Sequence, residues 1–394
     1  MKWLHRLWHT PRRTWLRRAM FQVHLWTGVG IGLYAAIIGL TGSALVFRTE
    51  IESALAPQIF RPGPVTTPLS LDTVLEHALQ GHKKQSVMGI DGLDDMDGPA
   101  IVYLKPASLT PGDAAEQRMV YVHRGTGEVL GSRLREGGFF GFCENLHVYL
   151  LAGERGYIAN GILAIVFLAL CLSGWVVWWP GIKSLARGVR IHWSAGWRRL
   201  NWDLHSVAGF WSNPALIAVV VTGVFFVFPQ PFMVALAKVS GGSVADVRAW
   251  FTTPESQTAK PGTVQISAQA AFGAAQSAVP SGMQIKYLAM PATPSGVFQA
   301  IAYWPHAAPY SQPVFLYVDQ YNGRLAGIHN AQHLPWGLRL ATYVYAVHFG
   351  SFAGMLSKVL WFLLGLLPTG LLVTGLVMWW NRSLRRVWKK LGQN

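Results

Sequence analysis

Four long apolar runs separate the polar stretches of this chain, and each run approaches the roughly 20 residues that a helix needs to cross a bilayer core. Since 51% of the residues are hydrophobic and only 13% are charged, the pattern favours a polytopic α-helical membrane protein over a soluble enzyme. The second and fourth spans carry extensions ahead of their apolar runs. The predicted spans cover residues 21–47, 146–179, 202–228 and 341–380.

Basic residues flank these spans on one side of the membrane. Six Lys or Arg lie in residues 1–20, five lie in the loop 180–201 and five lie in the tail 381–394, and none of these segments contains Asp or Glu. They account for the whole excess behind the net charge of +15. Cytoplasmic segments of membrane proteins are enriched in Lys and Arg. The pattern therefore predicts cytoplasmic termini and a cytoplasmic middle loop, and it argues against nucleic-acid binding.

The two halves of the chain repeat one another. Several unrelated positions recur at constant offsets, which are 181 residues for the first and third spans and 201 residues for the second and fourth. Because both halves enter from the cytoplasm, we predict a parallel internal duplication about an axis along the membrane normal. The matched positions are His24 and His205, Gly28 and Gly209, Thr41-Gly42 and Thr222-Gly223, His147 and His348, and Ser173-Gly174 and Thr374-Gly375.

Two polar segments, at residues 48–145 and 229–340, lie between the spans on the outer side. Each begins with a helical pattern and continues with alternating apolar residues that indicate strands and a closing hairpin. Each segment is therefore predicted to form a small α+β module. The helical patterns cover residues 68–80 and 264–279, and the hairpin turns are Thr126-Gly127 and Asn322-Gly323.

Four of the repeated positions are histidines at the ends of predicted spans. His24 and His205 lie in the first turns of the first and third spans on the cytoplasmic side, and His147 and His348 precede the other two apolar runs on the outer side. Ionisable residues at membrane depth are costly and point to function. A twofold axis would bring His24 to His205 and His147 to His348. Since imidazole is a usual axial ligand of haem iron, we predict two bis-histidine sites for haem b.

A different interpretation of these histidines stays open, in which they are interfacial residues copied by duplication and bonded to lipid or backbone. Haem is favoured because four histidines recur as two symmetric pairs on opposite sides, and small residues nearby would let a flat macrocycle approach the helices. No CxxCH motif occurs, so covalently attached haem is not expected. The small residues are Gly28, Gly32, Gly209, Gly153, Gly350 and Gly354.

The outer histidines lie far from the cytoplasmic end of their spans. The 32 residues from His147 to Trp179 would extend roughly 48 Å as one helix, whereas the hydrocarbon core is about 30 Å thick. Tilt, an aromatic relay between the haems or a break at Gly153–Gly156 would each relieve the mismatch.

Two further histidines, His329 and His333, precede the fourth span and have no counterpart in the first half. On one helical turn they would share a face and could touch iron or a substrate, although solvated loop histidines are the simpler interpretation. A transporter is disfavoured because the apolar runs carry no acidic residue and Asp203 lies at the interface. No Walker, flavin or nicotinamide-binding motif is apparent.

At these residues the sequence resembles the PepSY-associated transmembrane family, membrane proteins found with bacterial siderophore uptake. The resemblance covers nearly the whole chain. It implies four transmembrane helices and two periplasmic PepSY-like modules in the bacterial inner membrane. The motifs that carry it are His24-Leu-Trp-x-Gly28, Ser173-Gly-Trp-Val-Val-Trp-Trp-Pro180, Thr374-Gly-Leu-Val-Met-Trp-Trp380 and the two hairpins.

The resemblance also implies a ferric-siderophore reductase in which His24, His147, His205 and His348 bind two haems. A quinol or a partner protein would donate the electron, and Fe(III)-siderophore would accept it at the outer face, where His329 and His333 are candidate site residues. Fe(II) is softer than Fe(III) and is held less tightly by oxygen donors, so one electron releases the metal. Two other functions stay open: haem electron transfer to another acceptor, or a non-enzymatic PepSY binding or regulatory role.

Overall fold

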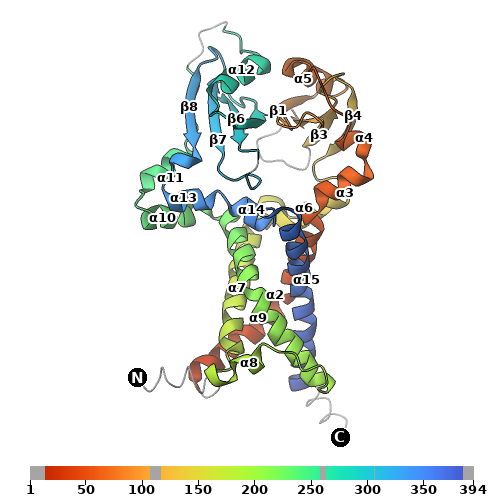
Figure 1. The fold of residues 1–394 in the computed structure, drawn as a ribbon, viewed down its shortest axis with the longest axis vertical. Coiled ribbons are helices and arrows are strands. Elements are labelled where there is room, and N and C mark those ends of the chain that lie inside the picture. The colour runs from red at the N-terminus through yellow and green to blue at the C-terminus, as the bar shows by residue number, and fades with distance from the viewer. Residues whose placement is uncertain (1–13, 107–116, 258–262, 306, 385–394) are drawn as a thin grey trace. The chain divides into compact units, whose positions relative to one another are not determined.

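The computed structural model describes residues 14–106, 117–257, 263–305 and 307–384, and the chain divides into two compact units (Figure 1). Most of the basic segments predicted at residues 1–20 and 381–394 lies outside the described residues. The membrane unit comprises residues 1–46, 143–229 and 347–394, and the sheet unit comprises residues 47–142 and 230–346.

Among the described residues of the membrane unit, four helices are long and apolar enough to cross a membrane, as the sequence predicts. The helix α2 packs against α7 and α15, and α9 packs against the same two helices, so the four form a closed ring (Figure 1). The first span begins earlier than predicted, which places His24 in the third turn of its helix rather than the first. The bounds are α2 (Trp15–Val46), α7 (Gly153–Trp178), α9 (Trp197–Val227) and α15 (Gly354–Trp379).

In the predicted second and fourth spans, 146–179 and 341–380, the outer extensions form short helices separate from the long ones. The helix α6 (Gly138–Tyr149) ends before α7 begins, and Leu150 and Leu151 between them have φ values of 49° and 58°. The same break separates α14 (Val344–His348) from α15. The outer histidines therefore lie on short separate helices, which removes the conflict between a 48 Å helix and the bilayer core.

The helices α2 and α15 approach one another closely at two glycines. A Cβ atom on Gly39 would overlap the carbonyl oxygen of Gly365, and a Cβ atom on Gly365 would overlap the side chain of Ser43. The Ser43 hydroxyl donates a 2.8 Å hydrogen bond to the Phe362 carbonyl oxygen of the facing helix. Small residues at these positions therefore allow backbone contact across the bundle.

The sheet unit is built on one eight-stranded antiparallel sheet, in the order β4-β3-β2-β1-β5-β6-β7-β8. The predicted hairpins are present as β3–β4 and β7–β8. Each segment contributes helices and four strands, and the pairing of β1 with β5, which the sequence does not predict, joins the strands of both segments in a single sheet. The strands are β1 (Gln85–Asp91), β2 (Ala100–Pro106), β3 (Arg118–Val122), β4 (Val129–Leu134), β5 (Gln284–Ala289), β6 (Val297–Tyr303), β7 (Val314–Asp319) and β8 (Leu325–Asn330).

Two helices, α5 (Leu71–Leu79) and α12 (Ala268–Ala278), complete the core of the sheet unit, where the sequence predicts helices. They bind each other at their N-terminal ends, because Asp72 Oδ1 accepts a 2.8 Å hydrogen bond from the Ala268 amide and Gln269 Oε1 accepts one of 2.9 Å from the Leu71 amide. The remaining helices are α3 (Arg48–Leu55), α4 (Pro57–Phe60), α8 (Leu185–Gly188), α10 (Pro229–Val239), α11 (Val244–Phe251) and α13 (Trp336–Ala341).

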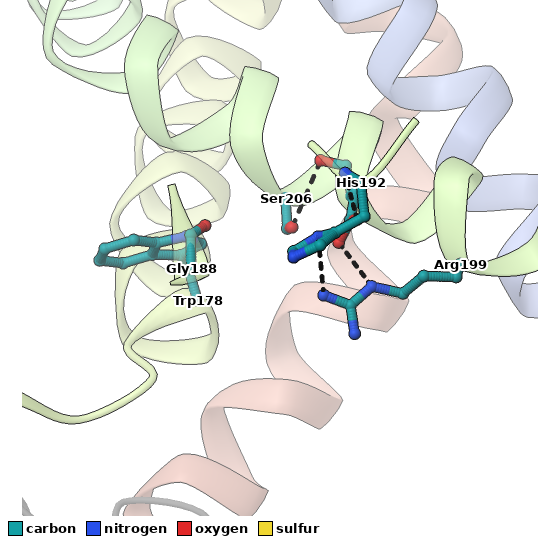
Figure 2. A network of polar contacts seen from close by, with 6 residues as sticks. Trp178, Gly188, His192, Arg199 and Ser206 are labelled. Atoms are coloured by element: carbon teal, nitrogen blue, oxygen red, sulfur yellow. Dashed lines mark hydrogen bonds and ion pairs between the residues drawn. The ribbon is translucent and has the colours of Figure 1, made fainter. Parts of the chain in front are cut away.

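The loop between α7 and α9 is folded back onto the membrane unit by a buried carboxylate (Figure 2). Asp203 is 1% exposed, and its carboxylate oxygens accept hydrogen bonds from the His192 amide (3.1 Å), from His192 Nδ1 (2.9 Å) and from Arg199 Nε (2.8 Å). The Trp178 indole donates a 3.1 Å bond to the Gly188 carbonyl oxygen of the same loop. These hydrogen bonds give Asp203 a structural role, which explains why an acidic residue is present at the membrane interface.

Replacing Asp203 with alanine is expected to release this loop. Hydrogen bonds to a charged group contribute about 1.5–3 kcal/mol each, less where the partner is exposed as Arg199 and His192 are. Limited trypsin digestion should cut after Lys183 or Arg187 about tenfold faster than in the unmodified protein. Ser206→Ala is the matched control because the Ser206 hydroxyl makes only a 3.5 Å contact with the Asp203 carbonyl oxygen. Equal cleavage of both variants would contradict the role given to the carboxylate.

Candidate functional site

The four repeated histidines meet as two facing pairs inside the membrane unit. The ring centroids of His24 and His205 are 6.4 Å apart with an angle of 82° between the ring planes. Those of His147 and His348 are 6.2 Å apart with an angle of 63°. We call them the inner and outer pairs, after the sides on which they were predicted. The structure thus brings together the two pairs that the sequence repeat selects, and all four rings are partly buried.

Each ring of the inner pair is held through its Nδ1 atom by the neighbouring helix. His24 Nδ1 lies 3.2 Å from the Leu170 carbonyl oxygen and 3.2 Å from the Ser173 hydroxyl on α7. His205 Nδ1 lies 2.9 Å from the Thr374 hydroxyl on α15. The two inner rings are therefore oriented by different helices in equivalent ways.

The outer pair is held in the same manner. His147 Nδ1 lies 3.0 Å from the Ile38 carbonyl oxygen and 3.1 Å from the Thr41 hydroxyl on α2. His348 Nδ1 lies 3.2 Å from the Val219 carbonyl oxygen and 2.9 Å from the Thr222 hydroxyl on α9. Because these two histidines stand on α6 and α14, the contacts connect the short helices to the long ones.

These contacts indicate the tautomer of each ring. The hydroxyl groups are also within bonding distance of carbonyl oxygens in the preceding turn of their own helices, for example Thr41 Oγ1 to Ile37 O at 2.8 Å and Thr222 Oγ1 to Val219 O at 2.8 Å. Their hydrogen atoms are donated there, so each hydroxyl oxygen accepts from Nδ1–H of the histidine. The proton is then on Nδ1, and the lone pair of Nε2 is left for a metal ion.

A glycine follows each hydroxyl residue and gives room for the edge of the ring. An added Cβ atom would lie close to the histidine Cε1 atom in every case, at 3.3 Å for Gly174 and His24, 3.3 Å for Gly375 and His205, 2.9 Å for Gly42 and His147, and 3.5 Å for Gly223 and His348. The sequence repeat contained these Ser/Thr-Gly pairs, but their role as supports of the histidines was not predicted. Their recurrence at the same offsets of 181 and 201 residues as the histidines was the available signal.

Replacing Gly42 with alanine is expected to disturb the outer pair, whereas Gly223→Ala is expected to leave it intact. The new methyl group would lie 2.9 Å from His147 Cε1 in the first variant, which forces the ring to shift, and 3.5 Å from His348 Cε1 in the second, which is ordinary contact. A side chain pushed off its rotamer costs about 0.5–1.5 kcal/mol, so retention of a ligand at the outer pair should fall about threefold to tenfold. The measurement is the amount of ligand that each variant retains per chain after dilution. Equal losses of ligand from Gly42→Ala and Gly223→Ala would contradict the steric argument.

The geometry of both pairs fits a metal ion between two imidazoles. If each Nε2 atom bonded one metal ion at about 2 Å, the ring centroids would be roughly 6 Å apart, and the two observed separations are 6.4 and 6.2 Å. The second ring nitrogen of a metal-bound histidine is usually bonded to a carbonyl or another acceptor, as Nδ1 is here. Each pair could therefore hold the iron of a haem, for which imidazole is a usual protein ligand.

The inner and outer pairs lie at different levels of the bundle. On α2, the inner pair is at His24 and the outer pair contacts Thr41 and Gly42. At 1.5 Å per residue, the two levels are roughly 25 Å apart along the helix axis. This distance is most of the thickness of a hydrocarbon core of about 30 Å.

The other two candidate residues, His329 and His333, do not lie together on one helical turn. His329 lies on β8 and His333 lies in the 3-10 turn Ala331–His333, so they do not share the face of one helical turn. His329 packs against Trp250 and Tyr317, with centroid distances of 5.9 and 5.0 Å, and burial lowers its pKa. His333 is exposed. His329 is therefore a packed, neutral residue of the sheet unit, and His333 matches the interpretation as a solvated histidine.

Comparison with known proteins extends over nearly the whole chain. A family model described as "PepSY-associated TM region" matches residues 21–382. No curated protein matches the sequence significantly. The matched range includes all four histidines and the strands of the sheet unit.

Proposed function

Because the chain belongs to the family of PepSY-associated transmembrane proteins, and because its bundle holds two facing histidine pairs, we propose that it binds two haems b and carries electrons across the inner membrane to a ferric siderophore. The observation that carries this proposal is the pairing of His24 with His205 and of His147 with His348 at 6.4 and 6.2 Å, with each Nδ1 atom already bonded. His24, His205, His147 and His348 would be the iron ligands.

The chain's own residues would fix the orientation and the tautomer of the ligands. The hydroxyl groups of Ser173 and Thr374 on the inner side, and of Thr41 and Thr222 on the outer side, hold Nδ1–H and so keep Nε2 directed away from the supporting helix. When bound, haem supplies a one-electron couple whose potential depends on axial ligands, hydrogen bonding and burial. Two sites roughly 25 Å apart along the helix axis would together cross most of the bilayer.

The proposed acceptor follows from the chemistry of iron chelates. Siderophores hold Fe(III) through hard oxygen donors, and Fe(II) is held less tightly by the same donors. One electron delivered at the outer pair would therefore release the metal without breaking the chelator. The proposal places the outer pair on the periplasmic side and both termini in the cytoplasm, in agreement with the basic segments 1–20, 180–201 and 381–394. The repeated contacts of the two pairs support a parallel duplication of the bundle.

The test is a visible spectrum of the purified protein, oxidised and then reduced with dithionite, together with a pyridine haemochrome assay. We expect a Soret band, sharp reduced α and β bands and about two haems b per chain. Reduced protein should then be reoxidised by a ferric siderophore while an Fe(II) chelator captures the product. Colourless protein from haem-sufficient cells would overturn the haem proposal. Haem that is not reoxidised by ferric siderophores would favour electron transfer to another acceptor.

A further inference from the structure

An open groove of about 700 Å³ lies in the membrane unit, between the start of α9 and the end of α15. Its volume falls in the range of about 300–1,000 Å³ that is usual for sites binding small organic molecules. Its lining is mainly aromatic and aliphatic, with one amide side chain. The lining residues are Trp197, Leu376, Val377, Trp379, Trp380 and Asn381.

The groove lies next in the sequence to the residues that support His205. Leu376 and Val377 closely follow Thr374, whose hydroxyl contacts His205, and Gly375, where an added Cβ atom would lie 3.3 Å from His205 Cε1. The distance from the Thr374 hydroxyl to His205 Nδ1 is 2.9 Å. A molecule in the groove would therefore lie within about one helical turn of the residues that hold the inner pair.

The charge and exposure of the groove suit an aromatic molecule with ring hydroxyl groups that enters from the membrane and loses protons from those hydroxyl groups there. Trp197 and Trp380 are 57% and 50% exposed, so the aromatic walls are accessible from the lipid side. The Arg198 guanidinium lies 5.8 Å from the centroid of the Trp197 ring and places a positive charge beside the apolar wall. Indole N–H groups and the Asn381 amide can donate hydrogen bonds to ring oxygens. The Arg198 cation and these hydrogen-bond donors would together stabilise a ring oxygen after it has lost its proton.

We propose that this groove binds a quinol and that the quinol is the electron donor for the inner histidine pair. This inference rests on the proposed function, because the acceptor is the haem assigned to His24 and His205. Each quinol loses two electrons and two protons and becomes a quinone. The two electrons reduce two Fe(III) ions to Fe(II) by way of that acceptor, one at a time. The two protons leave to water at the end of the bundle where α2 begins and α15 ends.

The experiment measures saturable binding of radiolabelled short-chain ubiquinone and menaquinone to the full chain in detergent. Leu376→Trp should fill the groove and weaken binding of the preferred quinone about tenfold. Leu363→Trp is the matched control, because Leu363 lies on the same helix, is 52% exposed and does not line the groove. Binding to this control should stay within about twofold of the unmodified protein. The corresponding quinol should reduce the haem of the unmodified protein and of the control, and should reduce the haem of Leu376→Trp more slowly.

Three results would overturn the inference: no saturable binding to the unmodified protein, equal affinities of the two variants, or complete displacement of quinone by excess phospholipid, which would identify a lipid groove. Haem content and reduction by dithionite are measured on the same samples. If dithionite-reduced protein releases Fe(II) but no quinone binds, the donor inference is wrong and the proposed function stands. If haem is absent while quinone binding still depends on Leu376, the proposed function fails and the groove remains a quinone site.

Discussion

Replacing His348 with alanine is expected to lower the haem content from about two per chain to about one, while the membrane unit stays folded. The substitution removes one of the two imidazoles that would hold the iron at the outer pair, whose ring centroids are 6.2 Å apart. It leaves the inner pair and its supports Ser173 and Thr374 in place. The pyridine haemochrome assay measures haem per chain, and the remaining spectrum should be that of the inner pair alone.

Electron transfer provides a second readout of the same variant. Dithionite should still reduce the remaining haem, whereas delivery to a ferric siderophore should fall by about two orders of magnitude or more because the outer site is missing. His333→Ala is the matched control, since His333 is exposed and lies in a 3-10 turn of the sheet unit. It should keep both haems. An unchanged haem content in His348→Ala, or an equal loss in the two variants, would contradict the assignment of His348 as an iron ligand.

The sequence predicts the membrane helices and the histidine pairs because both depend on local or regularly spaced features. An apolar run of sufficient length is a local property, and the shared offset of 181 residues links His24 to His205 without any knowledge of the packing. The contacts of Nδ1 are different. They depend on which helix lies beside each histidine, so the Thr41 hydroxyl could be seen as a repeated residue but not as the partner of His147.

The pairing of β1 with β5 and the exact position and conformation of the helix break before α7 could not be predicted, for related reasons. That a break could occur near Gly153–Gly156 was one of the explanations left open by the sequence. Alternating apolar residues predict strands equally well in two small sheets or in one large sheet, and the ladder that joins β1 to β5 pairs only Gly89 with Ala289 and Ile90 with Leu288. The interruption of the helix before α7 depends on left-handed backbone at Leu150 and Leu151. Leucine ordinarily favours helices. Neither the long-range strand pairing nor this conformation leaves a strong local signal.

Replacing Gly39 with alanine is expected to destabilise the membrane unit, although alanine is the better helix former. The added methyl group would overlap the carbonyl oxygen of Gly365, a backbone atom that cannot move without separating α2 from α15. Overpacking of this kind costs about 1–3 kcal/mol, and the loss of close backbone packing adds to the cost because small residues drive helix association in membranes. Thermal unfolding in detergent should show a midpoint lowered by several degrees.

Gly30→Ala is the matched control, and its effect on thermal stability should be absent or of opposite sign to that of Gly39→Ala. Gly30 is on the same helix, and a Cβ atom added there would have no atom within 4 Å among the described residues. Alanine favours a helix over glycine by about 1 kcal/mol, so this variant should be as stable as the unmodified protein or slightly more stable. If both variants lost stability equally, the cause would be a general intolerance of α2 to substitution. A loss confined to Gly39→Ala would show that contact between α2 and α15 sets the stability of the bundle that holds both histidine pairs.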